Sequence, residues 1–136
     1  MALNHTGTQA MSALQDLRVL VVENDEMSAT LLEMQLEQSG AVVVGQAGSV
    51  ADALRLLVET EPQVVLLDYR LAGNETSEPV ADALAERGIP FVLASGMVPE
   101  QLPASFRSGV LLTKPYLTVE LNKALIRALE GHSARA

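Results

Sequence analysis

Five short hydrophobic runs recur along the chain, and segments with helical periodicity separate them. The runs cover residues 18–23, 41–45, 63–68, 90–95 and 110–113. Within each run the apolar residues are nearly continuous and do not alternate with polar ones, which is typical of strands covered on both faces. The pattern therefore predicts five buried strands of one parallel sheet, joined by right-handed crossovers.

The connecting segments carry start and stop signals of helices. The predicted helices cover residues 25–38, 51–58, 77–88 and about 118–129. Ser49 is placed to cap the second helix, and Gly88 is placed to end the third. We expect the last helix to end before Gly131. The alternation of strands and helices predicts an α/β fold with helices on both faces of the sheet.

The fourth connection, residues 98–106, does not have the pattern of the others. Pro99 and Pro103 stand four residues apart. A proline inside a helix removes a hydrogen bond and clashes with the preceding turn. We therefore expect a short turn or an irregular loop in place of a full fourth helix.

Length and composition narrow the class of protein. A chain of 136 residues suits one domain, which we place at residues 17–131, with a flexible N-terminal segment at residues 1–16 and a tail at residues 132–136. The formal charge of −8 argues against direct nucleic-acid binding, which needs clustered Lys and Arg. No segment has the length of a membrane span, and the absence of Cys excludes disulfides. These features favour a cytoplasmic protein without membrane insertion.

Polar residues stand at the carboxyl ends of four of the five predicted strands. They are Glu23, Asn24 and Asp25 at the end of the first strand, Asp68 at the end of the third, Ser95 at the end of the fourth and Lys114 at the end of the fifth. Ligands of open parallel sheets bind outside the carboxyl ends of the strands. We therefore expect these side chains to converge at one edge of the sheet.

Each of these residues also has an ordinary structural explanation. Asp25 can cap the helix that follows it, where a carboxylate suits the helix dipole. Asp68 and Ser95 can be turn residues, and Lys114 can be a surface lysine. Taken together, the four ordinary explanations require a coincidence at every strand end that matters for a ligand, which favours a functional site.

The set of residue types fits phosphoryl transfer. Such chemistry needs a positioned nucleophile and cations that neutralise the phosphoryl oxygens. The Asp68 carboxylate can serve as the nucleophile and form an acyl phosphate. Lys114 supplies a positive charge and Ser95 a hydroxyl for the phosphoryl oxygens. Oxygen atoms of Glu23, Asn24 and Asp68, with waters and a backbone carbonyl, suit Mg²⁺.

At these residues the sequence resembles the CheY-like receiver domain of bacterial two-component response regulators. The matching segments are residues 19–23, 64–68, 91–96 and the pair Lys114-Pro115, and the likeness covers about residues 17–129. The resemblance implies a flavodoxin-like, doubly wound (β/α)5 fold with five parallel strands. Residues 73–80 and 88–92 further resemble stand-alone receivers that work without a fused output domain.

The resemblance also assigns roles to individual residues. Asp68 becomes the phospho-acceptor, with Lys114 as the residue that pairs with the phosphoryl group and Ser95 as the switch hydroxyl. Glu23 and Asn24 take the positions of the family's acidic pair. Together with Asp68 and the backbone carbonyl of Arg70, they form the implied Mg²⁺ site.

The sequence departs from the family pattern in three ways. Asn24 stands where the family usually has Asp, which predicts weaker binding of Mg²⁺ unless Asp25 contributes. Leu111 replaces the aromatic residue expected three positions before Lys114, so no ring can report phosphorylation there. Pro99 and Pro103 interrupt the fourth helix. We therefore expect phosphorylation to reorder residues 97–106 more than the last helix.

Three functional hypotheses follow. In the first, the chain accepts a phosphoryl group from a sensor histidine kinase or a histidine phosphotransfer protein, and acts through a downstream protein partner or a phosphorelay. It then has no enzyme activity beyond its own phosphorylation and dephosphorylation. In the second, it is a pseudo-receiver that binds partners without phosphorylation, as Asn24 and Leu111 suggest.

The third hypothesis is an enzyme or a flavin protein. A phosphatase of the haloacid dehalogenase type needs a second Asp two residues after the nucleophile, where this chain has Arg70. A flavodoxin relative needs a Ser-, Thr- or Gly-rich phosphate loop after the first strand. Here that position holds the acidic residues 23–25, which repel phosphate.

Overall fold

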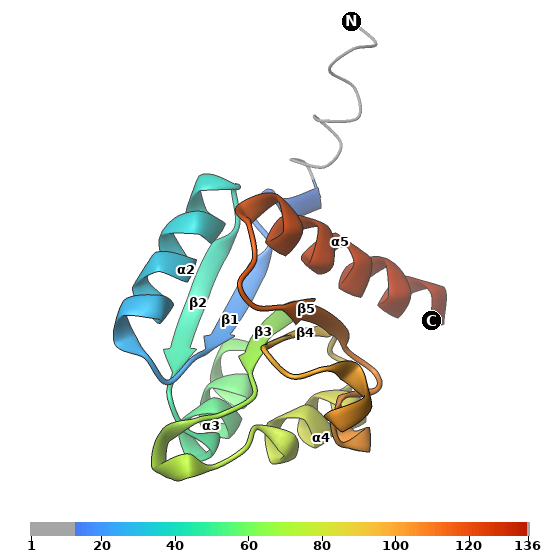
Figure 1. Cartoon of the computed structure of the whole chain (residues 1–136). Helices are drawn as coiled ribbons and strands as arrows, with labels where there is room; N and C mark the ends of the chain where they lie inside the picture. The colour runs from blue at the N-terminus through green and yellow to red at the C-terminus, as the bar shows by residue number, and fades with distance from the viewer. Residues whose placement is uncertain (1–12, 136) are drawn as a thin grey trace, which may run out of the picture.

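The computed structural model describes residues 13–135, and the chain alternates between strands and helices (Figure 1). The strands are β1 (Arg18–Val22), β2 (Val42–Ala47), β3 (Val64–Asp68), β4 (Phe91–Ser95) and β5 (Val110–Thr113). The α-helices are α2 (Glu26–Gln38), α3 (Val50–Thr60), α4 (Glu78–Arg87) and α5 (Thr118–Arg135). Three short 3₁₀ turns complete the described part: η2 (Ala72–Asn74), η3 (Pro99–Gln101) and η4 (Ala104–Phe106).

The five strands form one parallel sheet in the order β2-β1-β3-β4-β5. Strand order reverses between β1 and β3, which is the arrangement of flavodoxin-like folds. Helices α2 and α5 pack on one face of the sheet, and α3 and α4 pack on the other (Figure 1). The predicted five-stranded, doubly wound α/β fold is confirmed.

Successive strand residues supply the two halves of the core. In β1, Val19 and Val21 face the layer of α2 and α5, whereas Leu20 and Val22 face the layer of α3 and α4. All four are at most 1% exposed. This division follows from the alternation of side chains along a strand. Because both faces are covered, every central strand position is apolar, as the continuous hydrophobic runs indicated.

Helix boundaries follow the local signals in most places. The carboxylate of Asp25 accepts a hydrogen bond from the Ser28 N–H at the start of α2. At the start of α3, the hydroxyl of Ser49 accepts one from the Asp52 N–H. Gly88 adopts a left-handed conformation at the end of α4, with φ 68°. The prediction for the last helix is wrong at its end, because α5 continues through Gly131 to Arg135.

The fourth crossover has no α-helix. Two separate 3₁₀ turns, η3 and η4, occupy residues 99–106, and Pro99 and Pro103 each stand just before or at the start of a turn. Phe106 is 6% exposed and anchors the segment to the layer of α3 and α4. The predicted short or irregular fourth helix is confirmed, and its cause is that neither proline can donate a helical hydrogen bond.

The packed part of the chain begins before the predicted boundary at residue 17. Leu14 is 3% exposed and belongs to the core cluster beneath α2 and α5. Asp16 donates its N–H to the Gly40 carbonyl at 2.8 Å, which ties this segment to the end of α2. Most of the predicted flexible segment, residues 1–12, and residue 136 of the tail lie outside the described residues. Among the described helices, none combines the length and the hydrophobicity of a membrane span.

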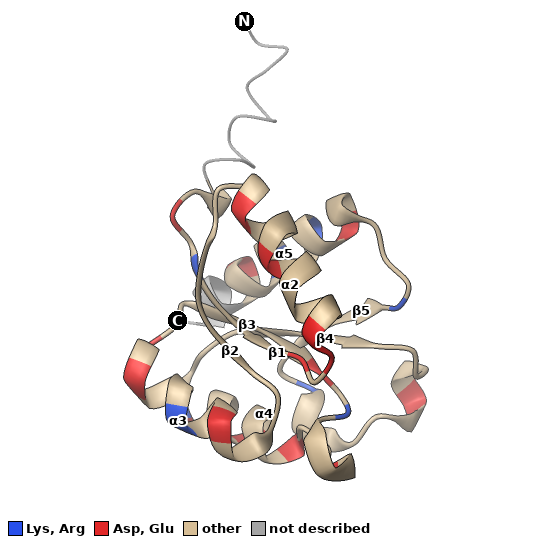
Figure 2. Ribbon diagram, turned by 90° about the vertical axis from the view of Figure 1, so that its left-hand side faces the viewer, with Lys and Arg blue, Asp and Glu red and all other residues tan. Residues whose placement is uncertain are grey.

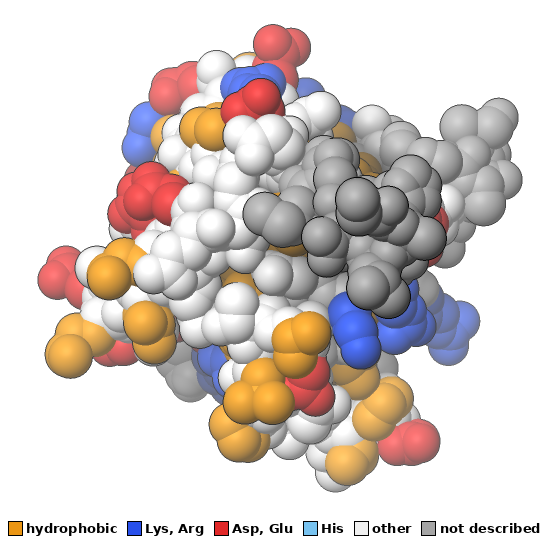
Figure 3. All heavy atoms as spheres, turned by 90° about the horizontal axis from the view of Figure 1, so that it is seen from above, with side chains coloured by type: hydrophobic (Ala, Val, Ile, Leu, Met, Phe, Trp, Pro, Cys, Tyr) orange, Lys and Arg blue, Asp and Glu red, His pale blue; other side chains and the backbone are white. Residues whose placement is uncertain are grey.

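The surface combines acidic residues with an apolar stripe on α2. Acidic positions are spread over the helices and loops, with fewer basic ones among them (Figure 2). Met27, Leu31 and Met34 of α2 are 82%, 56% and 53% exposed. Their spacing of four and three residues places them on one helix face. Figure 3 shows hydrophobic side chains exposed among acidic ones on the face seen from above.

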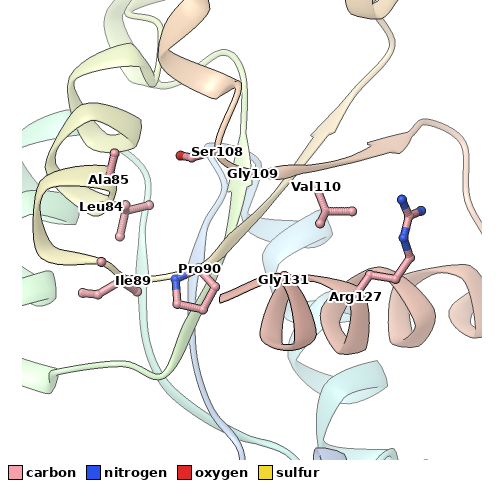
Figure 4. Close-up of a pocket in the computed structure, with 11 residues that line it drawn as sticks. Leu84, Ala85, Ile89, Pro90, Ser108, Gly109, Val110, Arg127 and Gly131 are labelled. Carbon is pink, nitrogen blue, oxygen red and sulfur yellow. The ribbon is translucent and has the colours of Figure 1, made fainter. Parts of the chain in front are cut away.

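A cavity of about 350 Å³ lies beyond the amino ends of β4 and β5, away from the polar strand ends (Figure 4). Gly109 lines this cavity, and its backbone runs against the buried ring of Phe91. A Cβ atom at Gly109 would lie 2.3 Å from Phe91 Cε2, and Phe91 is 1% exposed. The position therefore requires glycine for steric reasons.

We expect Gly109→Ala to lower the free energy of unfolding by about 1–3 kcal/mol, the usual cost of overpacking a core. Gly131→Ala is the matched control, because a Cβ there meets no atom within 4 Å and the residue lies in α5. That variant should be neutral or slightly more stable, since Ala favours a helix over Gly. Chemical denaturation of both variants tests this, and equal stability of the two would contradict the packing described here.

Candidate functional site

Four strand ends bring the predicted site residues to one edge of the sheet. Asp68 is the last residue of β3, and Ser95 is the last residue of β4. Glu23 and Lys114 immediately follow β1 and β5. The pairing of Asp68 with Ala94 and of Ser95 with Thr113 fixes the register between these strands. The expected convergence at the carboxyl ends is therefore present.

The centre of the site is an ammonium group beside two carboxylates. Lys114 Nζ lies 3.0 Å from Asp68 Oδ1 and 3.7 Å from Glu23 Oε1. The side chains of Glu23 and Asp68 are only 8% and 17% exposed, while that of Lys114 is 38% exposed. One positive charge thus faces two largely buried negative charges, and this imbalance favours a further cation.

The surroundings of Glu23 raise the pKa of its carboxyl. Burial of the carboxyl raises its pKa above the ordinary value of 4.5, and the negative charge of Asp68 raises it further. A hydrogen bond from the Asp25 N–H and the charge of Lys114 act in the opposite direction without cancelling the rise. The ionised form of Glu23 is therefore less favourable here than for a carboxyl in water.

Asp68 receives a second donor from the backbone. The N–H of Tyr69 donates to Asp68 Oδ1 at 3.0 Å, so this one oxygen accepts from both Tyr69 and Lys114. Hydrogen bonds to an ionised acceptor are shorter and stronger than neutral ones. The two donors fix the orientation of the carboxylate at the end of β3.

Asp25 is occupied as a helix cap. Its Oδ2 accepts hydrogen bonds from Ser28 N–H at 2.9 Å and from the Ser28 hydroxyl at 2.7 Å. These bonds to Ser28 lower the pKa of the Asp25 carboxyl. The Asp25 N–H in turn donates to Glu23 Oε2 at 3.0 Å. Asp25 therefore starts α2 and orients Glu23 through its backbone, as the capping explanation required.

Asn24 and Arg70 lie on the neighbouring loops. Asn24 is exposed, and its Oδ1 faces Gly48, whose carbonyl accepts the Ala72 N–H at 2.8 Å. Arg70 forms an isolated antiparallel bridge with Thr76. The hydrogen bonds of that bridge use the Tyr69 carbonyl and the Leu71 N–H, so they leave the Arg70 carbonyl out of the pairing.

The chemistry of these donors is compatible with a magnesium ion. Two carboxylates, one amide oxygen and one backbone carbonyl are the hard oxygen ligands that Mg²⁺ takes, with waters completing its shell. No group of three or more His, Cys, Asp or Glu side chains suitable for a metal occurs within residues 13–135, and the set from Glu23, Asn24, Asp68 and Arg70 contains only two carboxylates. Binding of Mg²⁺ at this set, and its weakness, stay predictions.

Ser95 and Leu111 make contacts other than those of Lys114, Asp68 and Glu23. Ser95 is 3% exposed; its hydroxyl accepts the Met97 N–H at 3.0 Å, and its carbonyl accepts the Lys114 N–H at 2.9 Å. Ser95 accepts in both bonds, so the hydrogen of its hydroxyl takes part in neither of them. Leu111 is half-buried and packs against the core on the side of α3 and α4.

Reasoning from the sequence assigned no role to two tyrosines at the site. Tyr69 directly follows Asp68, and Tyr116 follows the Lys114-Pro115 pair. Burial raises the pKa of Tyr116 to about 12, with help from the charges of Glu23 and Asp68, so its hydroxyl stays neutral at physiological pH. The available signal was the rarity of aromatic residues in this chain, which has two Tyr and two Phe.

The raised pKa of Glu23 predicts a pH-dependent stability. Between pH 4.5 and the raised folded value, the folded protein binds a proton that the unfolded chain has released, so stability falls as pH rises through this window. Without Mg²⁺, Glu23→Gln should therefore be more stable than the wild type at pH 7, and the difference should shrink below pH 4.5. Denaturation across pH 4–8 measures it.

Asp82→Asn is the matched control, since Asp82 is an exposed carboxylate on α4 away from the site. It should follow the wild type across the pH range. A Glu23→Gln protein that is less stable than the wild type at pH 7 would show that Lys114 outweighs burial.

Comparisons with known proteins agree with this architecture, although no family model matches the chain. SdrG from Sphingomonas melonis Fr1 is 37% identical, with a TM-score of 0.72, covering 83% of this chain and 96% of that one. A BeF3-activated conformation of SdrG is also known. The signal receiver domain of a modulated diguanylate cyclase from Desulfovibrio desulfuricans G20 is 27% identical, with a TM-score of 0.77, covering 89% and 100%.

Two longer proteins match over part of their length. The response regulator PhyR from Brucella abortus is 26% identical, with a TM-score of 0.78, and the match covers 98% of this chain and 56% of PhyR. A protein-glutamate methylesterase/protein-glutamine glutaminase from Halobacterium salinarum is 28% identical over 119 residues, which are 84% of this chain and 33% of the methylesterase. The common element is the five-stranded, doubly wound α/β fold described above. The chain belongs to the receiver domains of response regulators.

Proposed function

We propose that the chain accepts a phosphoryl group on Asp68 from a sensor histidine kinase or a histidine phosphotransfer protein. The observation that carries the proposal is the position of Lys114 Nζ, 3.0 Å from the Asp68 carboxylate, with Glu23 beside both. The proposal places the protein in the cytoplasm and gives it a protein partner or a phosphorelay as output. It includes no catalytic activity toward other substrates.

The reaction transfers one phosphoryl group. A lone pair of the Asp68 carboxylate forms the new P–O bond, and the P–N bond of the phosphohistidine breaks with its electron pair returning to the imidazole, which can then take a proton. Lys114 neutralises charge on the phosphoryl oxygens, and the Ser95 hydroxyl donates to one of them. When bound by Glu23, Asn24, Asp68 and the Arg70 carbonyl, Mg²⁺ supplies the remaining positive charge.

The surface next to the site supports a protein as phosphodonor. Met27, Leu31 and Met34 form an exposed apolar stripe on α2, whose first turn follows Glu23 and Asp25. Glu26, Glu33 and Glu37 lie on the same helix. A partner helix with an apolar face rimmed by Lys or Arg would complement this surface.

A pseudo-receiver that acts without phosphorylation is the second candidate. Two observations favour it: Asn24 lowers the negative charge available to a metal, and Leu111 provides no ring at the usual switch position. The geometry of Asp68 and Lys114 favours the first candidate, because a binding module has no need to hold a lysine against two buried carboxylates.

We expect incubation with a small phosphodonor such as acetyl phosphate and Mg²⁺ to add one phosphoryl group, and Asp68→Asn to abolish the addition. Asp68 is the carboxylate that Lys114 and Tyr69 N–H position, and an amide is not a comparable nucleophile. Intact mass with and without hydroxylamine measures the adduct. Asp82→Asn controls for nonspecific loss, and labelling that persists in Asp68→Asn would refute the assignment.

Restoring a carboxylate at position 24 should strengthen metal binding. Asn24→Asp adds one negative charge near a divalent ion in an open part of the site, which is worth about 1–2 kcal/mol, or roughly tenfold in the Mg²⁺ dissociation constant. Titration with Mg²⁺ measures the change. Asn74→Asp, on the exposed turn η2, is the control for added charge alone. Equal affinity in Asn24→Asp and the wild type would show that position 24 is not a ligand.

A further inference from the structure

An aromatic contact links the phospho-acceptor to the irregular fourth crossover. Tyr69 directly follows Asp68, and its ring packs against Phe106 of η4, with the ring centroids 5.6 Å apart and the planes at 52°. Phe106 is 6% exposed, and Tyr69 packs against the same core cluster. Tilted rings at this distance attract each other beyond their buried area.

The backbone of Tyr69 is attached to the reacting carboxylate. Its N–H donates to Asp68 Oδ1 at 3.0 Å, and its carbonyl accepts the Ser77 N–H at 2.8 Å. The guanidinium of Arg70 lies 5.4 Å from the centre of the Tyr69 ring. Tyr69 is therefore held by Asp68 through its backbone N–H, and by Phe106 and Arg70 through its ring.

We propose that the Tyr69–Phe106 pair transmits the phosphorylation state of Asp68 to residues 97–106. This inference rests on the proposed function and names the route by which its signal leaves the site. The route explains how a receiver with Leu111 at the usual aromatic position can still couple the acceptor to its surface. It runs through the residue after the acceptor and does not need a ring on β5.

The electrostatic cause lies at Asp68 Oδ1. In the free protein this oxygen belongs to an anion and accepts from both Tyr69 N–H and Lys114 Nζ. Formation of the acyl phosphate removes the carboxylate charge and moves negative charge to the phosphoryl oxygens. Lys114 then follows that charge, and the bond from Tyr69 N–H loses its charge assistance. The backbone of Tyr69 is released from its position, and its ring shifts against Phe106.

The receiving segment is held by few hydrogen bonds. The turns η3 and η4 contain the short-range bonds Gln101 N–H to Val98, Leu102 N–H to Pro99, Phe106 N–H to Pro103 and Arg107 N–H to Ala104, at 3.0–3.2 Å. Pro99 and Pro103 contribute no donors. Segments with few backbone bonds reorder at low free-energy cost. Phe106 is the buried side chain of η4, so displacement of its ring partner acts on the whole turn.

Hydrogen exchange of residues 97–106, with and without beryllofluoride and Mg²⁺, tests the route in the full chain. The variants are Tyr69→Leu and Phe106→Leu, which remove one ring each, and Tyr69→Phe, which keeps the ring and removes the hydroxyl. Phosphorylation by acetyl phosphate is followed by intact mass in every variant. In the wild type, beryllofluoride should change exchange in residues 97–106.

We expect the change to be about threefold smaller, or absent, in Tyr69→Leu and in Phe106→Leu, and to be retained in Tyr69→Phe. The double variant Tyr69→Leu/Phe106→Leu should lose no more than either single variant, because both act on one contact. Phosphorylation of Asp68 should persist in all of them. This combination separates lost transmission from a lost acceptor or a lost fold.

Three outcomes would overturn the inference. A full exchange response in either leucine variant would show that the contact does not carry the signal. Loss of the response in Tyr69→Phe would assign the signal to the hydroxyl. A response that disappears in Ser95→Ala while Tyr69→Leu retains it would place the whole route in the Ser95–Met97 hydrogen bond. Absence of the phosphoryl adduct in the wild type would instead refute the proposed function itself.

Discussion

The ammonium of Lys114 lies beside two carboxylates that the sheet holds at its carboxyl edge, and it neutralises only one of them. Asp68 and Glu23 are held close together, because Asp68 ends β3, Glu23 follows β1, and the apolar side chains of these two paired strands are at most 2% exposed. Burial first, and then the negative charge of Asp68, raise the pKa of Glu23. The net negative charge of this cluster favours a bound cation and then a phosphoryl group whose oxygens pair with Lys114, which supports the proposed reaction.

Much of the fold and of the site could be predicted from the sequence, because the determining signals are local. Continuous apolar runs identified the strands, and Pro99 and Pro103 identified the irregular crossover. Once the strands were known to be parallel, topology alone placed Glu23, Asp68 and Lys114 at one edge. The roles of these residues in phosphorylation and metal binding stay predictions, because they depend on a bound metal ion and a phosphodonor as well as on the fold.

Other features depend on contacts between distant residues, which no local pattern encodes. The Tyr69–Phe106 contact joins residues 37 positions apart, and only the packing of η4 against α4 brings them together. Leu14 lies in the N-terminal segment that was expected to be flexible, but it is buried in the core cluster beneath α2 and α5. Gly131 carried a stop signal, yet α5 passes through it because helix continuation costs little where no other conformation is required.

The interrupted fourth helix and Leu111, the two departures from the family pattern on the side of α3 and α4, have a common explanation in this arrangement. A full fourth helix would satisfy its own backbone bonds and resist displacement, whereas η3 and η4 are attached to the core through Phe106 and the partly buried Leu102. An aromatic ring on β5 would be redundant if Tyr69 already contacts that attachment point, so Leu111 can serve as ordinary core. In the proposed route, the irregular crossover and the absence of a β5 aromatic therefore belong together: a segment with few backbone hydrogen bonds would respond to Asp68, and Tyr69 would take the part of the β5 ring.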